Sequence, residues 1–208
     1  AAIGIGIDVS KPVGNMIVDV GGGTTKVTIV ENGEIIENTA LSVGARLITI
    51  DEDGIVTRLE ELGYRVGQSI GLDLKVGKSL NQADANLRNI AVVLANSLLE
   101  VVERKPLSPL TQELMRIPNL TYQGKIDAIV FSGGVSEYVY NKETKNYGDM
   151  GLALADEIGT RVRALRIPIV EPSQRIRATV IGASQYTIQV SGNTIYLSGK
   201  DILPVQNL

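Results

Sequence analysis

The sequence from residue 16 reads Met16-Ile17-Val18-Asp19-Val20-Gly21-Gly22-Gly23-Thr24-Thr25, and this run carries most of what can be inferred about the fold. Its apolar first half predicts a buried strand over 16–20 that presents the carboxylate of Asp19 near its end. Three glycines let the backbone turn sharply and bring its N–H groups close to an anion. A magnesium-bound phosphate chain requires such a carboxylate beside such amides. The pattern favours a phosphate-binding turn, with a plain hairpin turn as the alternative.

Each part of this turn has an expected role. Asp19 is expected to hold a metal ion or its bound waters, while the backbone amides hold phosphate oxygens. The residues expected to bind phosphate in this way are Gly21, Gly22, Gly23, Thr24 and Thr25, the last two through their hydroxyl groups.

The composition bounds the class of protein. At 208 residues the chain is long enough for one α/β domain, or for a main domain with a small insert. Its 20 Lys and Arg residues are nearly balanced by 23 Asp and Glu without a basic block, so nucleic acid is not an expected partner. The absence of Cys and His excludes thiol chemistry, disulfides and a His general base. No apolar run approaches the ~18 residues of a membrane span, so no membrane partner is expected.

A hairpin is predicted directly after the glycine turn. Residues 25–31 and 34–41 are rich in β-formers, and Asn32-Gly33 between them is a favoured two-residue turn. The stretch 43–46 predicts a helix or a turn. Residues 48–78 mix short strand signals with several glycines and fix no order of elements.

Two helices are predicted in the middle of the chain. Residues 82–104 carry apolar side chains at helical spacing, between Asn81 as N-cap and Pro106 as the stop. Ser108-Pro109 begins a shorter helix to about residue 116, with Ser at the N-cap and Pro in the first position. Both are expected to be structural helices that pack on the core or form an insert.

A second glycine turn follows about 110 residues after the first. Residues 126–131 predict a buried strand that runs into Ser132-Gly133-Gly134-Val135-Ser136 and the start of a helix. Small residues would let a base or ribose lie against the backbone, and the helix start would offer amides to a phosphate. Packing of strand against helix is the alternative reason for these glycines. Two such turns, one with an acid, predict the two halves of a nucleotide site.

The last third of the chain predicts further regular elements. A short strand is expected at 167–170, a helix over 175–186 and a hairpin over 187–198, the last across Gly192-Asn193. Residues 150–165 predict a helix whose packed face carries Leu152, Ala155, Ile158 and Val162.

Both glycine turns resemble motifs of the actin-like ATPase superfamily. Asp19-Val20-Gly21-Gly22-Gly23-Thr24-Thr25 is similar to its second phosphate motif, and Phe131-Ser132-Gly133-Gly134-Val135 to its adenosine motif. The opening residues 1–7, with Gly14-Asn15-Met16, are similar to bacterial actin homologues (MreB), where they join the interdomain helix to the C-terminal lobe. The resemblance implies an α/β fold of ribonuclease H-like type, with a mixed sheet flanked by helices and a small insert subdomain at roughly 48–120.

Other segments resemble one family within that superfamily, the ethanolamine ammonia-lyase reactivating factors, EutA. These segments are 41–47, 107–110, 131–137 and, most specifically, the run from Ile176 to Ile195. The resemblance covers essentially the whole chain in the right order. It implies ATP and Mg²⁺ as cofactors and ethanolamine ammonia-lyase as partner, whose damaged cobalamin is exchanged. It also implies a cytoplasmic protein, with association with a bacterial microcompartment left open.

The resemblance also implies roles for individual residues. Asp19 would be the catalytic residue, acting electrostatically on magnesium, through its bound water, or on the attacking water. Gly133 and Gly134 would face the adenosine, while Gly44 and Arg46 lie where relatives approach the nucleotide. Arg46 is equally consistent with a solvated surface charge, and Glu137 with an acid that complements a helix dipole.

One departure from the family pattern concerns the first phosphate loop, which in relatives is an Asp followed by Gly and Thr residues. Here Asp8 is followed by Ser10-Lys11-Pro12. Residues 1–208 are therefore expected to be the C-terminal lobe alone, with the N-terminal lobe of the same protein as a partner and with negligible ATP hydrolysis by this chain. Two alternatives stay open: a filament-forming bacterial actin homologue and the lobe of a sugar or acetate kinase.

Overall fold

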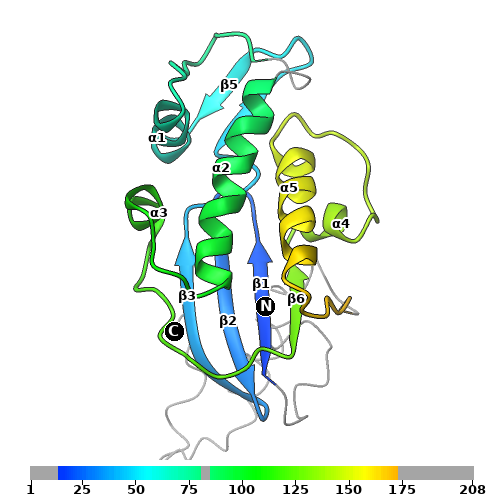
Figure 1. Ribbon diagram of the computed structural model, residues 1–208. Helices are drawn as coiled ribbons and strands as arrows, with labels where there is room; N and C mark the ends of the chain where they lie inside the picture. Colours follow the sequence, from blue (N-terminus) through cyan, green and yellow to red (C-terminus); the bar gives the residue numbers. More distant parts are fainter. Residues whose placement is uncertain (1–13, 81–84, 173–208) are drawn as a thin grey trace, which may run out of the picture.

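A four-stranded mixed sheet lies at the centre of the structure, a computed structural model that describes residues 14–80 and 85–172 (Figure 1). Its strands are β1 (Asn15–Val20), β2 (Thr25–Glu31), β3 (Glu34–Leu41) and β6 (Ala128–Ser132), in the order β3-β2-β1-β6. β1 pairs antiparallel with β2 and parallel with β6. The predicted α/β class and mixed sheet are confirmed.

The hairpin predicted after the glycine turn is present. β2 and β3 pair antiparallel on either side of Asn32 and Gly33, whose φ angles are 52° and 82°. Two successive positive φ angles are what a type I′ turn requires, which explains why Asn-Gly stands there. β1 and β2 form a second hairpin, because Val20 pairs with Thr25 across the glycine turn. The hairpin geometry named as the alternative for residues 16–25 is therefore present, and phosphate binding by the same turn stays a prediction.

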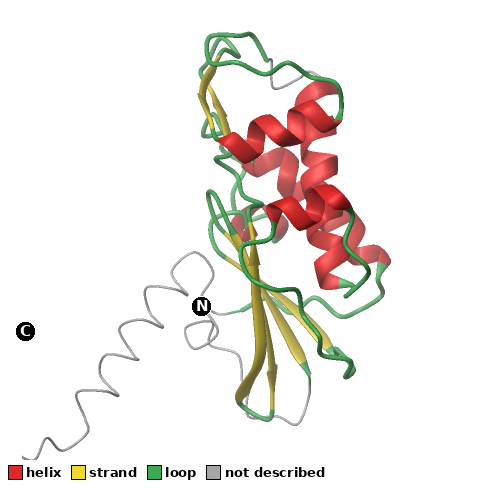
Figure 2. Ribbon diagram, turned by 90° about the vertical axis from the view of Figure 1, so that its left-hand side faces the viewer, coloured by secondary structure: helices red, strands yellow, loops and turns green. Residues whose placement is uncertain are grey.

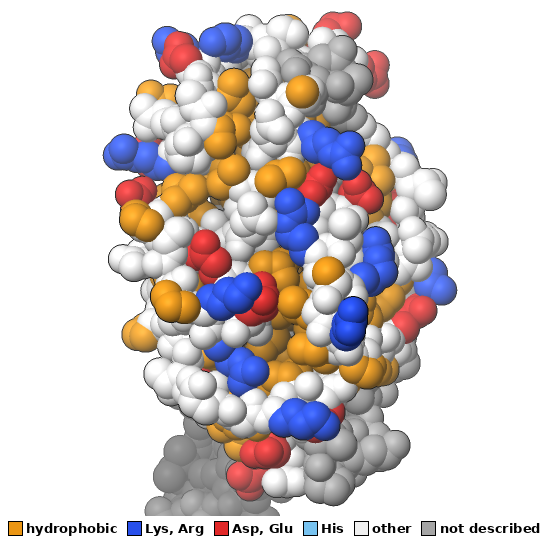
Figure 3. All heavy atoms as spheres, in the orientation of Figure 1, with side chains coloured by type: hydrophobic (Ala, Val, Ile, Leu, Met, Phe, Trp, Pro, Cys, Tyr) orange, Lys and Arg blue, Asp and Glu red, His pale blue; other side chains and the backbone are white. Residues whose placement is uncertain are grey.

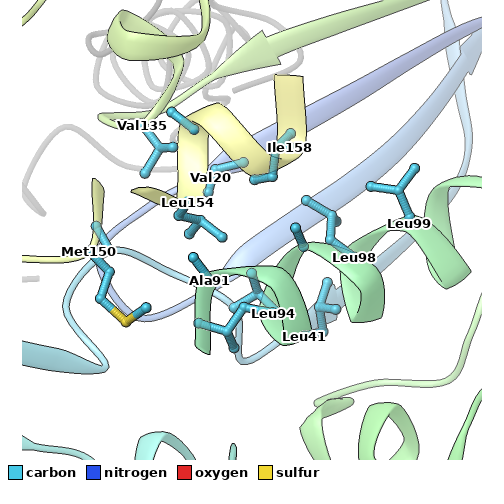
Figure 4. Close-up of a cluster of buried hydrophobic side chains, with 14 of the residues drawn as sticks. Val20, Leu41, Ala91, Leu94, Leu98, Leu99, Val135, Met150, Leu154 and Ile158 are labelled. Carbon is cyan, nitrogen blue, oxygen red and sulfur yellow. The ribbon is translucent and has the colours of Figure 1, made fainter. Parts of the chain in front are cut away.

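Two helices cover one face of the main sheet (Figure 2). They are α2 (Ala85–Val102) and α5 (Gly151–Ala164), which pack against each other and against the sheet. Figure 4 shows Leu94 and Leu98 of α2 with Leu154 and Ile158 of α5 in the buried cluster between helices and strands. Because side chains alternate along a strand, Val18 and Val20 face this core while Asp19 faces the other side of the sheet.

A smaller unit lies beyond the end of the sheet at which β1 and β6 terminate (Figure 1). It contains the antiparallel strands β4 (Ile48–Ile50) and β5 (Val56–Leu59) and helix α1 (Glu61–Ser69). The segment 148–150 holds this unit to the start of α5, since Ile50 N donates to Gly148 O at 2.8 Å and Thr49 bridges to Asp149. The extent of an insert subdomain over 48–120 stays a prediction.

The long excursion between β3 and β6 returns to the sheet where it left. Helix α3 (Pro109–Leu114) begins at the predicted N-cap Ser108, whose Oγ accepts from Thr111 N at 3.3 Å. At its end, Ser42 N donates to Leu114 O at 2.7 Å, and Leu41 forms a bridge with Met115. Backbone bonds therefore close the stretch 42–114 at one point on the sheet edge.

Two expectations about helices and one about a strand need correction. Leu152 is 37% exposed in the first turn of α5, and Leu154 takes its place on the packed face, because Leu154, Ile158 and Val162 are spaced four residues apart and share one side of the helix. Residues 167–170 make only a bridge from Ile169 to Ile129 rather than a strand. α2 is long and apolar enough by length and composition to cross a membrane, so the expectation that no apolar run reaches that length is wrong. More than half of α2 is buried inside the fold, as expected of a core helix.

Positive and negative side chains are interspersed over the face formed by α2 and α5 (Figure 3). Among them Glu157 of α5 is buried, and it accepts from Arg88 Nε of α2 at 2.9 Å and pairs with Arg161. Burial acts to raise the pKa of Glu157, but the hydrogen bonds from the two arginines outweigh it and lower that pKa. Residues 1–13, 81–84 and 173–208, with the predicted N-cap Asn81, the helix 175–186 and the hairpin 187–198, lie outside the described residues.

Candidate functional site

The two glycine turns meet at one edge of the main sheet. Because β1 and β6 are parallel neighbours, Asp19 stands opposite Ser132, and Ser132 Oγ donates to Asp19 Oδ1 at 3.1 Å. The first turn follows β1 and the second follows β6, so both emerge at the same end of the strands. A hydrogen bond between residues 113 positions apart therefore joins the two motifs.

Asp19 is held at this edge with little exposure to solvent. Only 6% of the residue is exposed, and it lies on the face of the sheet opposite α2 and α5. Lys26 faces it across the hairpin, with Lys26 Nζ 3.9 Å from Asp19 Oδ2.

A cavity of about 360 Å³ opens between the two turns. Gly21 and Gly22 of the first turn and Gly134 of the second are in its wall, together with Arg46, Tyr138 and Asp149. A ligand in this cavity would touch both motifs at once. In the described part of the chain, Asp19 borders this edge without being part of the cavity wall.

The glycines of the second turn have different environments. Gly133 has a φ of +83°, and a Cβ added there would lie 2.4 Å from Val20 O. A Cβ on Gly134 would have no atom within 4 Å. The fold therefore requires glycine at 133, whereas Gly134 leaves open space at the cavity.

Residues 43–46, which follow β3, pack against the first turn and hold its backbone. A Cβ on Gly44 would lie 2.4 Å from Gly22 O, so Gly44 allows the close approach of two backbones. Ala45 N donates to Gly21 O at 3.1 Å and Arg46 N donates to Gly22 O at 2.5 Å. Residues 43–46 form a turn rather than a helix. Gly44 is buried under the glycine turn, and its contact with a nucleotide stays a prediction.

The two threonines of the first motif do not line the cavity in the described structure. Thr25 is fully buried, and its Oγ1 donates to Val43 O at 2.8 Å, which adds a third link between the turn and residues 43–46. Thr24 is half-buried and its carbonyl accepts from Gly21 N at 3.0 Å. Gly23 faces open space, since a Cβ there would meet nothing within 4 Å.

The amides around the start of α4 (Ser136–Val139) already donate to backbone carbonyls of the second turn and of β1. Val135 N donates to Val20 O at 3.3 Å, Ser136 N to Gly133 O and Glu137 N to Gly134 O. The helix has only four residues. The expectation that a helix N-terminus offers these amides to a phosphate is therefore wrong. Glu137 lies in the first turn of α4 and in the cavity wall.

The far wall of the cavity comes from residues 138–149, which are rich in acids and tyrosines. Burial, with the charges of Asp149 and Glu143, raises the pKa of Tyr138 to about 12. Hydrogen bonds from Lys145 N, the Tyr147 hydroxyl and Thr144 N lower the pKa of Glu143. Tyr138 is thus neutral and Glu143 ionised at neutral pH.

A second cavity, of about 390 Å³, lies on the other side of the glycine turn. Gly22, Gly23 and Arg46 are in its wall with Arg58 and Arg116. Arg46 and Gly22 are shared by both cavities, so the first turn forms a ridge between an acidic hollow and a more basic one.

The acidic side chains near the glycine turns fit a magnesium ion only if most of its ligands are water and phosphate oxygens. Among residues 14–80 and 85–172 no group of three or more acidic side chains could hold a metal ion. A single buried carboxylate, Asp19, fits an ion that keeps several waters and takes other ligands from phosphate oxygens.

Several residues in the cavity wall could not be predicted from the sequence. Tyr138 reaches the cavity from α4, whereas Glu143, Tyr147 and Asp149 reach it because residues 141–149 fold back toward the first turn. Lys26 was foreseeable, because a hairpin closed by residues 20 and 25 places residue 26 opposite residue 19.

Comparisons with known proteins agree on one family. The family described as "Ethanolamine utilisation protein EutA" matches residues 7–208. The "Ethanolamine ammonia-lyase reactivase EutA" of Salmonella typhimurium is 32% identical over 196 residues, which is 92% of this chain and 40% of that protein. The corresponding Escherichia coli protein matches at the same identity and coverage. The chain thus spans about 40% of the length of these curated relatives.

More distant matches are to cell shape-determining proteins. The cell shape-determining protein Mbl of Bacillus subtilis is 28% identical over 92 residues, 44% of this chain and 27% of that protein. Among solved structures, MreB5 of Spiroplasma citri bound to AMPPNP aligns with 92% of this chain and 58% of its own, at 18% identity and a TM-score of 0.45. At that identity and TM-score the structural match carries no argument about function.

Proposed function

Because the chain belongs to the family of the ethanolamine utilisation protein EutA, we propose that it is part of an ATP-dependent factor that reactivates ethanolamine ammonia-lyase. The factor promotes exchange of the damaged cobalamin in the lyase for an intact one. The name of the 32% identical relatives, which describes a reactivase for this lyase, supports the proposal. The lyase is then the partner, and the cytoplasm is the proposed location.

The chain corresponds in this proposal to the C-terminal lobe of a two-lobed protein. It matches about 40% of the curated relatives, and the first phosphate loop of the family pattern has no counterpart in its sequence. The other lobe supplies the opposing half of the cleft. Closure of the two lobes on a nucleotide biases a surface that contacts the lyase.

The nucleotide lies across the two glycine turns. The observation that supports this is that Gly21 and Gly22 of the first motif and Gly134 of the second line the same cavity. Beside this cavity, Asp19 accepts a hydrogen bond from Ser132. Gly21, Gly22, Gly23 and Thr24 hold the phosphates, and Gly133 and Gly134 adjoin the nucleoside. Gly44 and Thr25 do not contact the phosphates in this proposal; they fix the backbone of the first turn.

Asp19 is the proposed catalytic residue. Its carboxylate is buried, is held by Ser132 and lies next to the glycine turn. From there it orients waters of the phosphate-bound Mg²⁺ or the attacking water, and it acts electrostatically. The bound Mg²⁺ supplies positive charge that offsets the charge of the phosphates.

Calorimetric titration of the 208-residue chain with Mg-ATP tests the nucleotide site. Binding is expected, and Asp19→Asn is expected to weaken Mg-ATP more than ATP without magnesium, because it removes the charge that faces the ion. Asp53→Asn, at an exposed carboxylate in the β4–β5 turn, is the matched control. Absence of binding by the unchanged chain would remove the nucleotide from the proposal.

Reactivation is tested with the complete protein that contains this chain. Asp19→Asn is expected to abolish reactivation of cobalamin-inactivated lyase, while Asp53→Asn leaves it intact. The 208-residue chain alone is expected to hydrolyse ATP negligibly, because one lobe lacks the opposing phosphate loop. Robust turnover by the chain, lost in Asp19→Asn, would contradict its assignment as half of a cleft.

A second candidate function, a filament-forming actin homologue, is favoured by the match to Mbl over 44% of the chain. The two functions are separated by sedimentation of the complete protein with ATP. ATP-dependent polymers without reactivation of the lyase would favour the filament.

A further inference from the structure

Arg46 lies on the ridge between the two cavities. The backbone of Arg46 is anchored there, because Arg46 N donates to Gly22 O. Its side chain runs over the glycine turn, with Cδ 3.4 Å from the position a Cβ on Gly22 would take. Arg46 is also in the wall of both cavities. A guanidinium so placed reaches either side of the turn without movement of the backbone.

The present partner of Arg46 is Asp149, across the first cavity. Arg46 Nε lies 3.6 Å from Asp149 Oδ2, and the Arg46 side chain is 65% exposed while that of Asp149 is 11% exposed. Asp149 is fixed, because its Oδ1 accepts from Gly151 N at 2.8 Å at the start of α5. The guanidinium end of this pair is largely exposed and lies beyond hydrogen-bond distance of the carboxylate, while Asp149 keeps its hydrogen bond from Gly151 N, so the exchange of Arg46 for another partner costs little.

The other arginines near the turn are held elsewhere. Arg58 Nε donates to Glu60 Oε1 at 2.8 Å, and Arg116 Nε donates to Ser42 Oγ at 2.8 Å. Both line only the second of the two cavities beside the turn. Arg46 is therefore the arginine in position to follow a ligand seated against Gly21 and Gly22.

We propose that Arg46 binds the phosphate groups of a ligand in the first cavity, and that it leaves Asp149 to do so. This rests on the proposed nucleotide site and names the residue that selects phosphorylated ligands at it. A phosphate carries more charge than one carboxylate and accepts two parallel hydrogen bonds from a guanidinium. Asp149 competes with the ligand for Arg46 and repels phosphate at the same time, so it limits affinity.

The exchange predicts opposite effects of the two residues. Arg46→Ala is expected to weaken Mg-ATP and inorganic tripolyphosphate by about tenfold, the loss typical of a charge-assisted hydrogen bond, and to leave adenosine unchanged. Arg46→Lys retains part of the binding, because a point charge replaces the fork. Asp149→Asn keeps an acceptor for Gly151 N and is expected to tighten both anions by about threefold, since it removes a like charge.

Isothermal titration of the 208-residue chain and its variants with these three probes tests the proposal. Matched controls are Arg65→Ala on the outer side of α1 and Asp156→Asn, an exposed acid of α5 that pairs with Arg88. Both are expected to bind like the unchanged chain.

The outcomes separate this proposal from the proposed function. If the unchanged chain binds Mg-ATP and Arg46→Ala binds it equally well, the role of Arg46 is overturned and the nucleotide site stands. Equal weakening of adenosine by Arg46→Ala would also overturn it, because that points to a disturbed turn. If the unchanged chain binds neither anion, both proposals fail together.

Discussion

The two glycine turns look alike in sequence, yet the structure holds them in different ways. The first closes a hairpin, and its shape is imposed from outside by residues 43–46, where Gly44 lets one backbone lie against another. The second leads from a strand into a helix, and it depends on the positive φ of Gly133 together with the close approach of this glycine to Val20 O of β1. Each turn also has a glycine that faces open space, Gly23 and Gly134. A glycine that the fold requires is thus distinct from one that leaves room for a ligand.

The largest effect is expected at the second turn. Gly133→Ala combines a φ of +83° with a Cβ 2.4 Å from Val20 O, and it should lower the free energy of unfolding by about 3 kcal/mol. Urea unfolding measures the change. The control Gly134→Ala should stay within about 0.5 kcal/mol of the unchanged chain. Equal losses at both positions would erase the distinction between required and open glycines.

A smaller loss is expected at the support of the first turn. Gly44→Ala places a Cβ within 2.7 Å of three backbone atoms of Gly22 and Gly23, and it should cost about 2 kcal/mol of unfolding free energy. Residues 43–46 can shift partly because they are a turn, which makes the loss smaller than at Gly133. Gly23→Ala is the matched control and should leave stability unchanged. If Gly23→Ala were the more harmful of the two, the first turn would be strained from within as well.

The bond that joins the turns should contribute less. Ser132→Ala removes the donor to Asp19 Oδ1 and should lower the free energy of unfolding by about 1 kcal/mol. Because Asp19 loses its fixed orientation, Mg-ATP binding should weaken as well. Ser79→Ala, at an exposed serine, should change neither quantity. Unchanged stability and binding in Ser132→Ala would mean that the turns act independently.

The smallest expected effect on stability near neutral pH comes from the ionisation of Tyr138, which follows the second turn. Its pKa in the folded protein is raised to about 12 from 10.0, first by burial and then by the charges of Asp149 and Glu143. A folded pKa above the unfolded one favours the neutral phenol in the fold, so this stability is present below pH 10 and is lost as the pH rises through about 12.

Tyrosinate absorbance against pH measures this, with Tyr138→Phe to identify the signal. Asp149→Asn should move the titration of Tyr138 back toward 10.0, because it removes one of the charges. A titration of Tyr138 near 10.0 in the unchanged chain would show that the acidic wall is not closed over the second turn.

The fold was predictable where a local pattern determines the backbone. Asn32-Gly33 identified the β2–β3 hairpin, and Ser108-Pro109 the start of α3, because turn and cap chemistry act over a few residues. Leu152 was misplaced, since the packed face of α5 follows the four-residue spacing of Leu154, Ile158 and Val162, from which Leu152 is offset. The order of elements in 48–78 had no such pattern to reveal it.

The site was predictable in its motifs and not in its far wall. Parallel pairing of β1 with β6 brings the two glycine turns together, and their acid and small residues signalled a ligand. Glu143, Tyr147 and Asp149 enter only through the path of residues 141–149, which no spacing rule describes. The sequence also did not distinguish the role of Gly44, which packs against the backbone of Gly22, from that of Gly134, which has open space around it.

The closure of residues 42–114 by Ser42 and Leu114 has a consequence for how the molecule can change. Since the two ends are fixed to each other, material added to or removed from the β4–β5 unit does not alter the path of the sheet. Doubling the length of a closed loop adds only about 0.6 kcal/mol of closure entropy. The exposed tip at Asp51, Glu52 and Asp53 is therefore a position where evolution can enlarge the protein, and where a reporter domain can be grafted without disturbing the glycine turns.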